Sequence, residues 1–129
     1  MEPLFLSLAE VLEIHQDQIT RYGGEPGLRD LELLKSALGA PMATFGGELL
    51  HAGLHEIAAA YLFHITRNHP FVDGNKLTGA AAALVFLLLN GLEVRAGTNA
   101  LAEMVLSVAC GRLNKPEIAL FFRNHTRPV

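Results

Sequence analysis

The stretch NKLTGAAAALVFLLLN, residues 75–90, decides the fold class of this 129-residue chain. It contains an apolar run of eleven residues, Gly79–Leu89. A membrane-spanning helix needs about 20 such residues, so the run predicts a helix inside a protein core. A helix that is apolar on nearly all sides is surrounded by other helices. We therefore expect a central, fully buried helix that ends at Gly91 in the C′ position.

Five further stretches show helical spacing together with the signals that begin and end helices. Ser7 and Glu10 have the spacing of a capping box, and the residues 22–27, rich in Gly and Pro, end the helix that follows. Asn114, with Pro and Glu shortly after it, begins the last helix. The other expected helices run from Asp30 to the break at Gly39 and Pro41, over Leu50–Arg67, and from an Asn99 cap to about Arg112 with Leu101, Val105, Val108 and Ala109 facing inward.

The remaining segments predict little regular structure. Alternation over Leu92–Ala96 favours a short strand or hairpin arm, and residues 42–48 have no clear pattern beyond room for a short helical turn. The fold class is therefore all-α, a compact bundle of about six helices around a buried central helix. No linker or repeat divides the chain, which we expect to be a single domain over residues 1–129.

Composition excludes several classes of function. Hydrophobic residues make up 50% of the chain and charged residues 18%, which excludes intrinsic disorder. The net charge of -3 argues against direct DNA binding, which relies on neutralising phosphates. The single cysteine, Cys110, allows no intramolecular disulfide. The first residues lack a basic segment before an apolar stretch, so we expect no signal peptide, no membrane association and a cytoplasmic location.

The stretch HPFVDGNKLT, residues 69–78, is where the sequence points to chemistry. The first turn of a helix leaves backbone N–H groups unpaired and positively polarised, Gly74 lets an anion approach them, and Lys76 adds a positive charge. Asp73 offers the oxygen ligands that Mg²⁺ prefers, and His69 can act as a general base near neutral pH. These residues suggest phosphoryl or nucleotidyl transfer. A surface loop followed by an Asp-Gly-Asn turn is the structural alternative, and the residues alone leave both open.

The same stretch resembles the signature of the Fic/Doc family, His-x-Phe-x-Asp/Glu-Gly/Ala-Asn-x-Arg, and in particular its Doc branch, which has Lys before the Arg. Ile14–Leu38 and Ala60–Phe71 also resemble the corresponding parts of Doc proteins, so the likeness covers almost the whole chain. It implies a six-helix Fic fold and a toxin of a toxin–antitoxin pair. It also implies a kinase that uses ATP and Mg²⁺ to phosphorylate a threonine of elongation factor Tu, which halts translation.

The resemblance assigns a role to each residue of the signature. His69 would take the proton from the target hydroxyl, and Asp73 would hold Mg²⁺ against the nucleotide phosphates. Gly74, Asn75 and Lys76 would line an anion hole through their backbone N–H groups and, for Asn75 and Lys76, their side chains. Lys76 is the feature that favours the kinase branch over the other Fic proteins, which transfer AMP.

One position departs from the signature, because Leu77 stands where the family has Arg. That Arg contacts the nucleotide phosphates, and such charge-assisted bonds are each worth roughly 1.5–3 kcal/mol. Leu77 therefore marks either a natural homologue that is weakened or redirected, or a detoxifying change. Three functions remain open: a kinase toxin, an AMP transferase, and an inactive Fic-fold binding module. A metallohydrolase centred on His51 and His55 is a distant fourth.

Regulation is expected to act in trans. Self-inhibited Fic proteins carry a helix with the pattern Ser/Thr-x-x-x-Glu-Gly/Asn, and the nearest match here, Thr44–Glu48, is followed by Leu49 and contains two glycines that disfavour a helix. The resemblance suggests an antitoxin whose disordered tail folds into an apolar groove of this chain.

The remaining candidate residues have mainly structural interpretations. His51 and His55 are four apart, as zinc ligands on a helix can be, but no third ligand is evident. His15 is expected to be a core histidine bonded to neighbouring backbone. The other expectations are an inert Cys110 in an apolar helix, His64 and His125 as surface or packing residues, Arg67 and Asn68 supporting the loop or facing solvent, and Phe71, Phe121 and Phe122 in the core.

Overall fold

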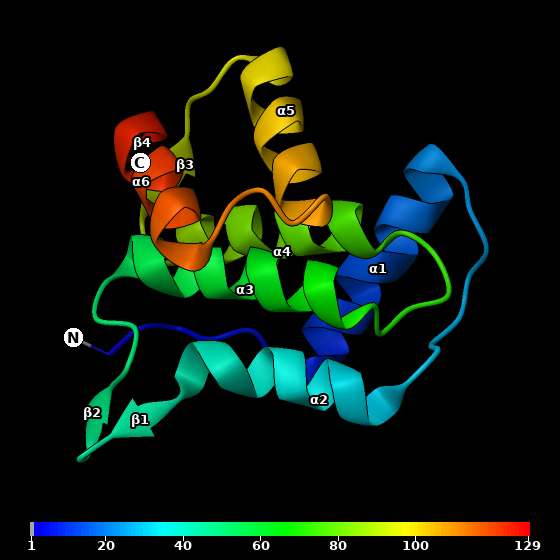
Figure 1. Cartoon of the computed structure of the whole chain (residues 1–129), viewed down its shortest axis with the longest axis horizontal. Coiled ribbons are helices and arrows are strands. Elements are labelled where there is room, and N and C mark those ends of the chain that lie inside the picture. Colours follow the sequence, from blue (N-terminus) through cyan, green and yellow to red (C-terminus); the bar gives the residue numbers. More distant parts are fainter. Residues whose placement is uncertain (1) are drawn as a thin grey trace.

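The computed structural model describes residues 2–129, and that range folds mainly into six α-helices (Figure 1). The helices are α1 (Leu8–Tyr22), α2 (Leu31–Gly39), α3 (Leu54–Asn68), α4 (Asn75–Leu89), α5 (Thr98–Ala109) and α6 (Lys115–His125). The short elements are a 3-10 turn, η1 (Ala40–Met42), and the strands β1 (Thr44–Phe45), β2 (Glu48–Leu49), β3 (Leu92–Val94) and β4 (Thr126–Pro128). The predicted helical class is confirmed.

Helices α3 and α4 form the centre of the bundle, side by side (Figure 1). Helices α2 and α6 pack on α3, α1 packs on α4, and α5 touches both. Gly79 allows the close approach of the central pair: a Cβ at this position would lie 3.1 Å from the carbonyl oxygen of Leu62. The loop that joins α3 to α4 is thereby held at one end of the best-packed pair of helices.

Aromatic side chains fill the core between these helices. Tyr61, Phe86 and Phe122 are almost completely buried, and the rings of Tyr61 and Phe86 lie 5.3 Å apart. The Tyr61 hydroxyl accepts a hydrogen bond from the backbone N–H of Leu6 at 2.9 Å. This bond ties the segment before α1 to the middle of α3.

Four local signals at helix ends were predicted correctly. Ser7 with Glu10, and Asn114 with Glu117, form complete capping boxes at the starts of α1 and α6. Asp30 caps α2 through a bond from the N–H of Leu33 at 3.0 Å. Gly91 follows α4 with a φ of 89°, and the predicted strand after it, β3, pairs with β4 at the end of the chain.

The central helix is not fully buried, and this expectation was wrong. Val85, Leu88 and Leu89, near the end of α4, are exposed. The helices that pack on α4 cover its other sides, so one side of its last turns faces solvent within residues 2–129. No helix in that range is long and apolar enough to cross a membrane.

Two helix starts also differ from the expectation. Helix α3 begins at Leu54 instead of Leu50, because the β1–β2 hairpin precedes it and Gly53 is its N-cap. Helix α5 begins after Gly97, whose extended backbone forms the cap, so Asn99 lies inside the first turn. Val105 and Val108 face inward as predicted, whereas Ala109 is exposed.

Candidate active site

The loop between α3 and α4 is shaped by two residues with left-handed backbone. His69, the C-cap of α3, has a φ of 50°, and Gly74, the N-cap of α4, has a φ of 78°. Between them, Phe71 turns inward and is 1% exposed. Its ring stacks on His15 with centroids 3.8 Å apart, so the place in the core expected for Phe71 is confirmed.

Helix α1 supports the same loop through His15. This histidine is buried, and its Nε2 lies 2.9 Å from the carbonyl oxygen of Asp73. The expectation of a core histidine bonded to neighbouring backbone is confirmed. The segment after α1 adds a second support, because the N–H of Val72 donates to the carbonyl of Gly27 at 3.0 Å and Leu28 pairs with Phe71 in an isolated bridge.

The side chain of Asn75 forms hydrogen bonds to the backbone of the loop. Its Oδ1 accepts from the N–H of Phe71 at 2.9 Å, and its Nδ2 donates to the carbonyl of Phe71 at 3.0 Å. The same Nδ2 lies 3.3 Å from Nδ1 of His69. The side chain therefore links the loop to the imidazole, and the backbone N–H is what Asn75 can offer to an anion.

One cavity of about 420 Å³ gathers the residues that the sequence singled out. Its walls are formed by Gly23, Thr66, His69, Val72, Asp73, Gly74, Asn75, Lys76, Leu77 and Ala109. The position that departs from the family signature, Leu77, thus lies in the same wall as the imidazole. Lys76 is exposed and has no ion-pair partner within residues 2–129.

The N-terminus of α4 opens onto this cavity without a side-chain cap. The first N–H to make a helical bond is that of Thr78, which donates to the carbonyl of Gly74 at 2.9 Å. The N–H groups of Asn75, Lys76 and Leu77 have no partner in the part of the chain that the structure describes. Unpaired N–H groups at a positively polarised helix end form an anion site.

Asp73 presents an exposed carboxylate at the edge of the anion site. Its Oδ1 accepts from the N–H of Gly74 at 2.9 Å, and its Oδ2 accepts from that of Glu25 at 3.3 Å. Gly24 makes room for it, because a Cβ there would lie 2.8 Å from Oδ2. Each oxygen keeps a lone pair, so the carboxylate has the donor chemistry that Mg²⁺ prefers.

Two residues near the site were not predicted. Arg29 donates from Nε to the carbonyl of His69 at 2.6 Å, across forty positions of sequence. Thr66 is 2% exposed, its hydroxyl has no partner in residues 2–129, and the residue lines the cavity. Neither has a local pattern, since each acquires its place only through the packing of distant segments.

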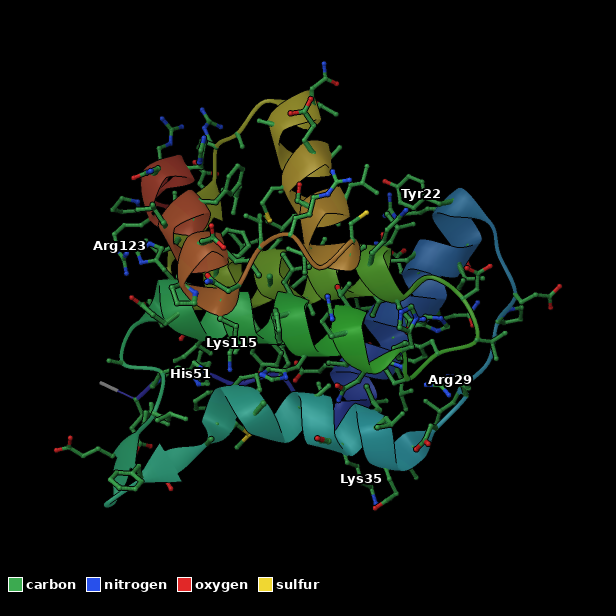
Figure 2. The ribbon with its side chains drawn as sticks, viewed as in Figure 1. Tyr22, Arg29, Lys35, His51, Lys115 and Arg123 are labelled. Carbon is green, nitrogen blue, oxygen red and sulfur yellow. The ribbon has the colours of Figure 1, made fainter. Side chains whose placement is uncertain are left out.

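The alternative zinc site rested on a wrong assumption. His51 precedes α3 and so does not share a helix with His55, whose Nε2 lies 2.8 Å from the hydroxyl of Thr126. His51 lies beside Lys115 (Figure 2), and the Nε2 atoms of His51 and His64 are 3.4 and 3.1 Å from its Nζ. No group of three potential ligands occurs within residues 2–129.

Burial and the Lys115 charge both disfavour a charged His64 and lower its pKa to about 4. His64 therefore packs as a neutral acceptor, consistent with the packing role expected for it.

Cys110, expected inside an apolar helix, is instead exposed just after α5, at its C-cap. Asn68, the last residue of α3, donates to the carbonyl of Leu33 at 3.0 Å and so ties the end of α3 to α2.

Comparisons with known proteins identify the family of this chain. The model of the Fic/DOC family matches residues 5–87, which is more than half of the chain. The chain belongs to the Fic/Doc family. Within it the chain is similar to Doc toxins. Protein kinase doc of Escherichia phage P1 is 33% identical over 114 residues, which cover 88% of this chain and 89% of the relative. Toxin Doc of Mycolicibacterium smegmatis is 45% identical over 75 residues, 58% of each chain.

Proposed function

We propose that this Doc-like toxin transfers the γ-phosphate of ATP to a threonine hydroxyl of elongation factor Tu and blocks translation in the cytoplasm. One observation carries the proposal: a histidine and an uncapped helix N-terminus share a single cavity. A nucleotide phosphate suits the helix end, and a hydroxyl suits the imidazole. The printed name of the phage relative, a protein kinase, supports the same reaction class.

The step divides between the nucleotide and the target. His69 takes the proton of the threonine hydroxyl, whose oxygen forms a bond to the γ-phosphorus. The bond from that phosphorus to the β–γ bridging oxygen breaks, and ADP leaves with the electron pair. The N–H groups at the start of α4 and the ammonium of Lys76 stabilise the charge on the phosphate oxygens.

The resting imidazole has to change partner before it can act as the base. Asn75 donates toward Nδ1 of His69, so a neutral ring carries its hydrogen on Nε2. His69 then accepts the proton either at Nδ1, in place of Asn75, or at Nε2 after the ring exchanges its tautomer. Binding of the target is the event that drives this exchange in our proposal.

Asp73 is the residue that would hold Mg²⁺. Bound there, the ion would neutralise part of the charge on the β- and γ-phosphates. The chain itself orients this carboxylate, because Gly24 leaves room for it and the N–H of Glu25 donates to it.

Leu77 favours a second candidate, a Fic-fold binding module that has lost most of its transfer activity. Its side chain supplies apolar surface to the cavity, where the family signature has a phosphate-binding guanidinium. The two candidates differ in what restoring the Arg would do. A weakened kinase gains activity from Leu77→Arg, whereas a site that has changed elsewhere does not.

The experiment is intact-mass measurement of elongation factor Tu after incubation with ATP, Mg²⁺ and this protein. Wild type, Leu77→Arg and Leu77→Arg/His69→Ala are compared. We expect one added phosphate with Leu77→Arg and a smaller yield with wild type. His69→Ala should reduce the rate by about 10²–10⁴, the usual contribution of a general base, with helical content unchanged. An added AMP would replace the kinase by an AMP transferase, and an unmodified target in all samples would contradict transfer.

We further propose that the chain acts as a single domain, residues 1–129, and is restrained by an antitoxin whose disordered tail folds on binding. One relative is named Toxin Doc, and the other also carries the name doc. These names support such a partner. Co-expression with the product of the neighbouring upstream gene tests it. A complex with raised thermal stability is expected, and a toxic Leu77→Arg protein that no neighbouring product binds or suppresses would contradict it.

A further inference from the structure

Arg29 lies in the connection between α1 and α2 and reaches the end of α3 (Figure 2). Its Nε donates to the carbonyl of His69 at 2.6 Å, and its Nη2 donates to the carbonyl of Asn68 at 3.1 Å. Carbonyl groups at the end of a helix lack intrahelical partners and carry partial negative charge. A guanidinium that donates to two of these carbonyls supplies the missing hydrogen bonds and a compensating positive charge.

The backbone that Arg29 holds is an unfavourable one. His69 is the only residue other than glycine with a positive φ in residues 2–129. The left-handed conformation is unfavourable for a residue with a side chain, and glycine usually takes this position after a helix. An imidazole at this position requires a histidine, so the surrounding structure has to hold that histidine in the left-handed conformation.

The backbone beside Arg29 reinforces this hold. The N–H groups of Arg29 and Asp30 both donate to the carbonyl of Pro70, at 2.7 and 3.0 Å. Four hydrogen bonds from two consecutive residues therefore converge on three consecutive carbonyls, those of residues 68–70. Arg29 itself is not among the residues that line the cavity.

We propose that Arg29 is a positioning residue for the proposed reaction: it fixes His69 in the left-handed conformation and thereby aims the imidazole into the cavity beside Asn75. This inference rests on the proposed function. Because Arg29 acts through the backbone of His69 and lies outside the nucleotide cavity, its loss affects the rate of transfer more than the binding of ATP.

The kinetic test uses the Leu77→Arg protein as the parent, in which transfer is measurable if the proposed function is correct. Arg29→Ala is expected to lower kcat about 10- to 100-fold, a part of the 10²–10⁴ that a general base contributes, with the KM for ATP unchanged. Arg29→Lys should keep an intermediate kcat, because an ammonium reaches one carbonyl but cannot fork to two. Arg21→Ala is the matched control, since Arg21 is an exposed arginine of α1 paired with Asp17.

Chemical rescue separates positioning from a general loss of folding. Guanidinium ion, added below its denaturing range, should restore part of the kcat of Arg29→Ala and none of the kcat of His69→Ala. An Arg29→Ala protein that loses ATP binding and transfer together, without rescue, contradicts the proposal.

A readout that needs no activity tests the same idea by NMR. The three-bond HN–Hα coupling of His69 reports its φ, and the ring signals of His69 report its orientation. In Arg29→Ala both are expected to change, whereas the signals of His15 and the helical content stay as in the parent. If Arg29→Ala unfolds, the same signals are read in Arg29→Lys, where a partial change is expected. Unchanged coupling and ring signals in the folded variants overturn the role of Arg29. Absence of transfer in the parent, with these signals changed as expected, overturns the proposed function and leaves the role of Arg29 in shaping His69.

Discussion

His64 makes the stability of this fold depend on pH in a defined window. Burial first, and then the charges of Lys115 and His51, lower its pKa from 6.5 to about 4. In the unfolded chain the imidazole is protonated below 6.5, whereas in the folded chain it stays neutral down to about 4. The free energy of unfolding therefore has its full value above the higher pKa, falls as the pH decreases through the window, and levels below the lower one.

The size of the effect follows from the shift and from the exposure of the ring. At 1.36 kcal/mol per pKa unit the shift corresponds to about 3 kcal/mol, and because His64 is only half-buried, solvent screening reduces this to about 1–2 kcal/mol. His51 and His55 contribute in the same direction, since burial lowers the pKa of each as well. A variant is needed to separate the part that belongs to His64.

Urea unfolding at a series of pH values from above 6.5 to about 4 measures this dependence. In His64→Gln the amide can still accept from Lys115 but does not titrate, so about 1–2 kcal/mol of the loss should disappear. Lys115→Met removes one cause but leaves the burial, so it should raise the pKa of His64 only in part. An imidazole of His64 that titrates by NMR at its ordinary value, or a His64→Gln protein with the pH dependence of wild type, would refute the reasoning.

Three further substitutions test contacts that define the fold and the site. Gly79→Ala places a Cβ 3.1 Å from the carbonyl oxygen of Leu62, so we expect overpacking to cost about 1–3 kcal/mol in urea unfolding, against a gain of about 1 kcal/mol in helix propensity. Tyr61→Phe leaves the buried N–H of Leu6 without an acceptor and should cost about 1–3 kcal/mol in the same assay. Gly24→Ala, at a φ of 118°, brings a Cβ within 2.8 Å of a carboxylate oxygen of the loop, and calorimetry should show weaker binding of ATP with Mg²⁺.

Sequence alone was sufficient for several features that are determined by residues close together in the chain. The capping boxes at Ser7 and Asn114 involve partners three positions away, and both were predicted. The candidate site was located because its residues fall within one stretch, 69–78, in front of an apolar helix. Periodicity likewise identified the helices that form the bundle.

Some of the features that were missed are local, and the others depend on contacts between distant segments. Helix α3 starts late because a short hairpin occupies the residues before it. The two glycines in the turn of that hairpin, Gly46 and Gly47, were not enough to predict the two-residue strands on either side. The exposed side of α4 is set by which neighbours pack on it, which no local pattern reveals. Arg29 meets His69 only because the α1–α2 connection folds against the loop. The charge of Arg29 did not indicate this contact, because an exposed arginine is common in such a connecting segment.

The geometry around Leu77 bears on how strongly the proposed site would bind a phosphate. Three unpaired N–H groups and the polarised end of α4 come from the backbone, so the anion site that we propose does not depend on the side chain at this position. A helix end stabilises an anion by about 0.3–1 kcal/mol, and up to about 2 kcal/mol when partly buried. The missing guanidinium would have added roughly 1.5–3 kcal/mol, which corresponds to about 10- to 150-fold in affinity. A difference of this size would weaken the proposed nucleotide binding without changing the loop that holds His69. Leu77→Arg is therefore expected to add a phosphate contact from the first turn of α4, and a strong gain of transfer from that single change is what a weakened kinase requires.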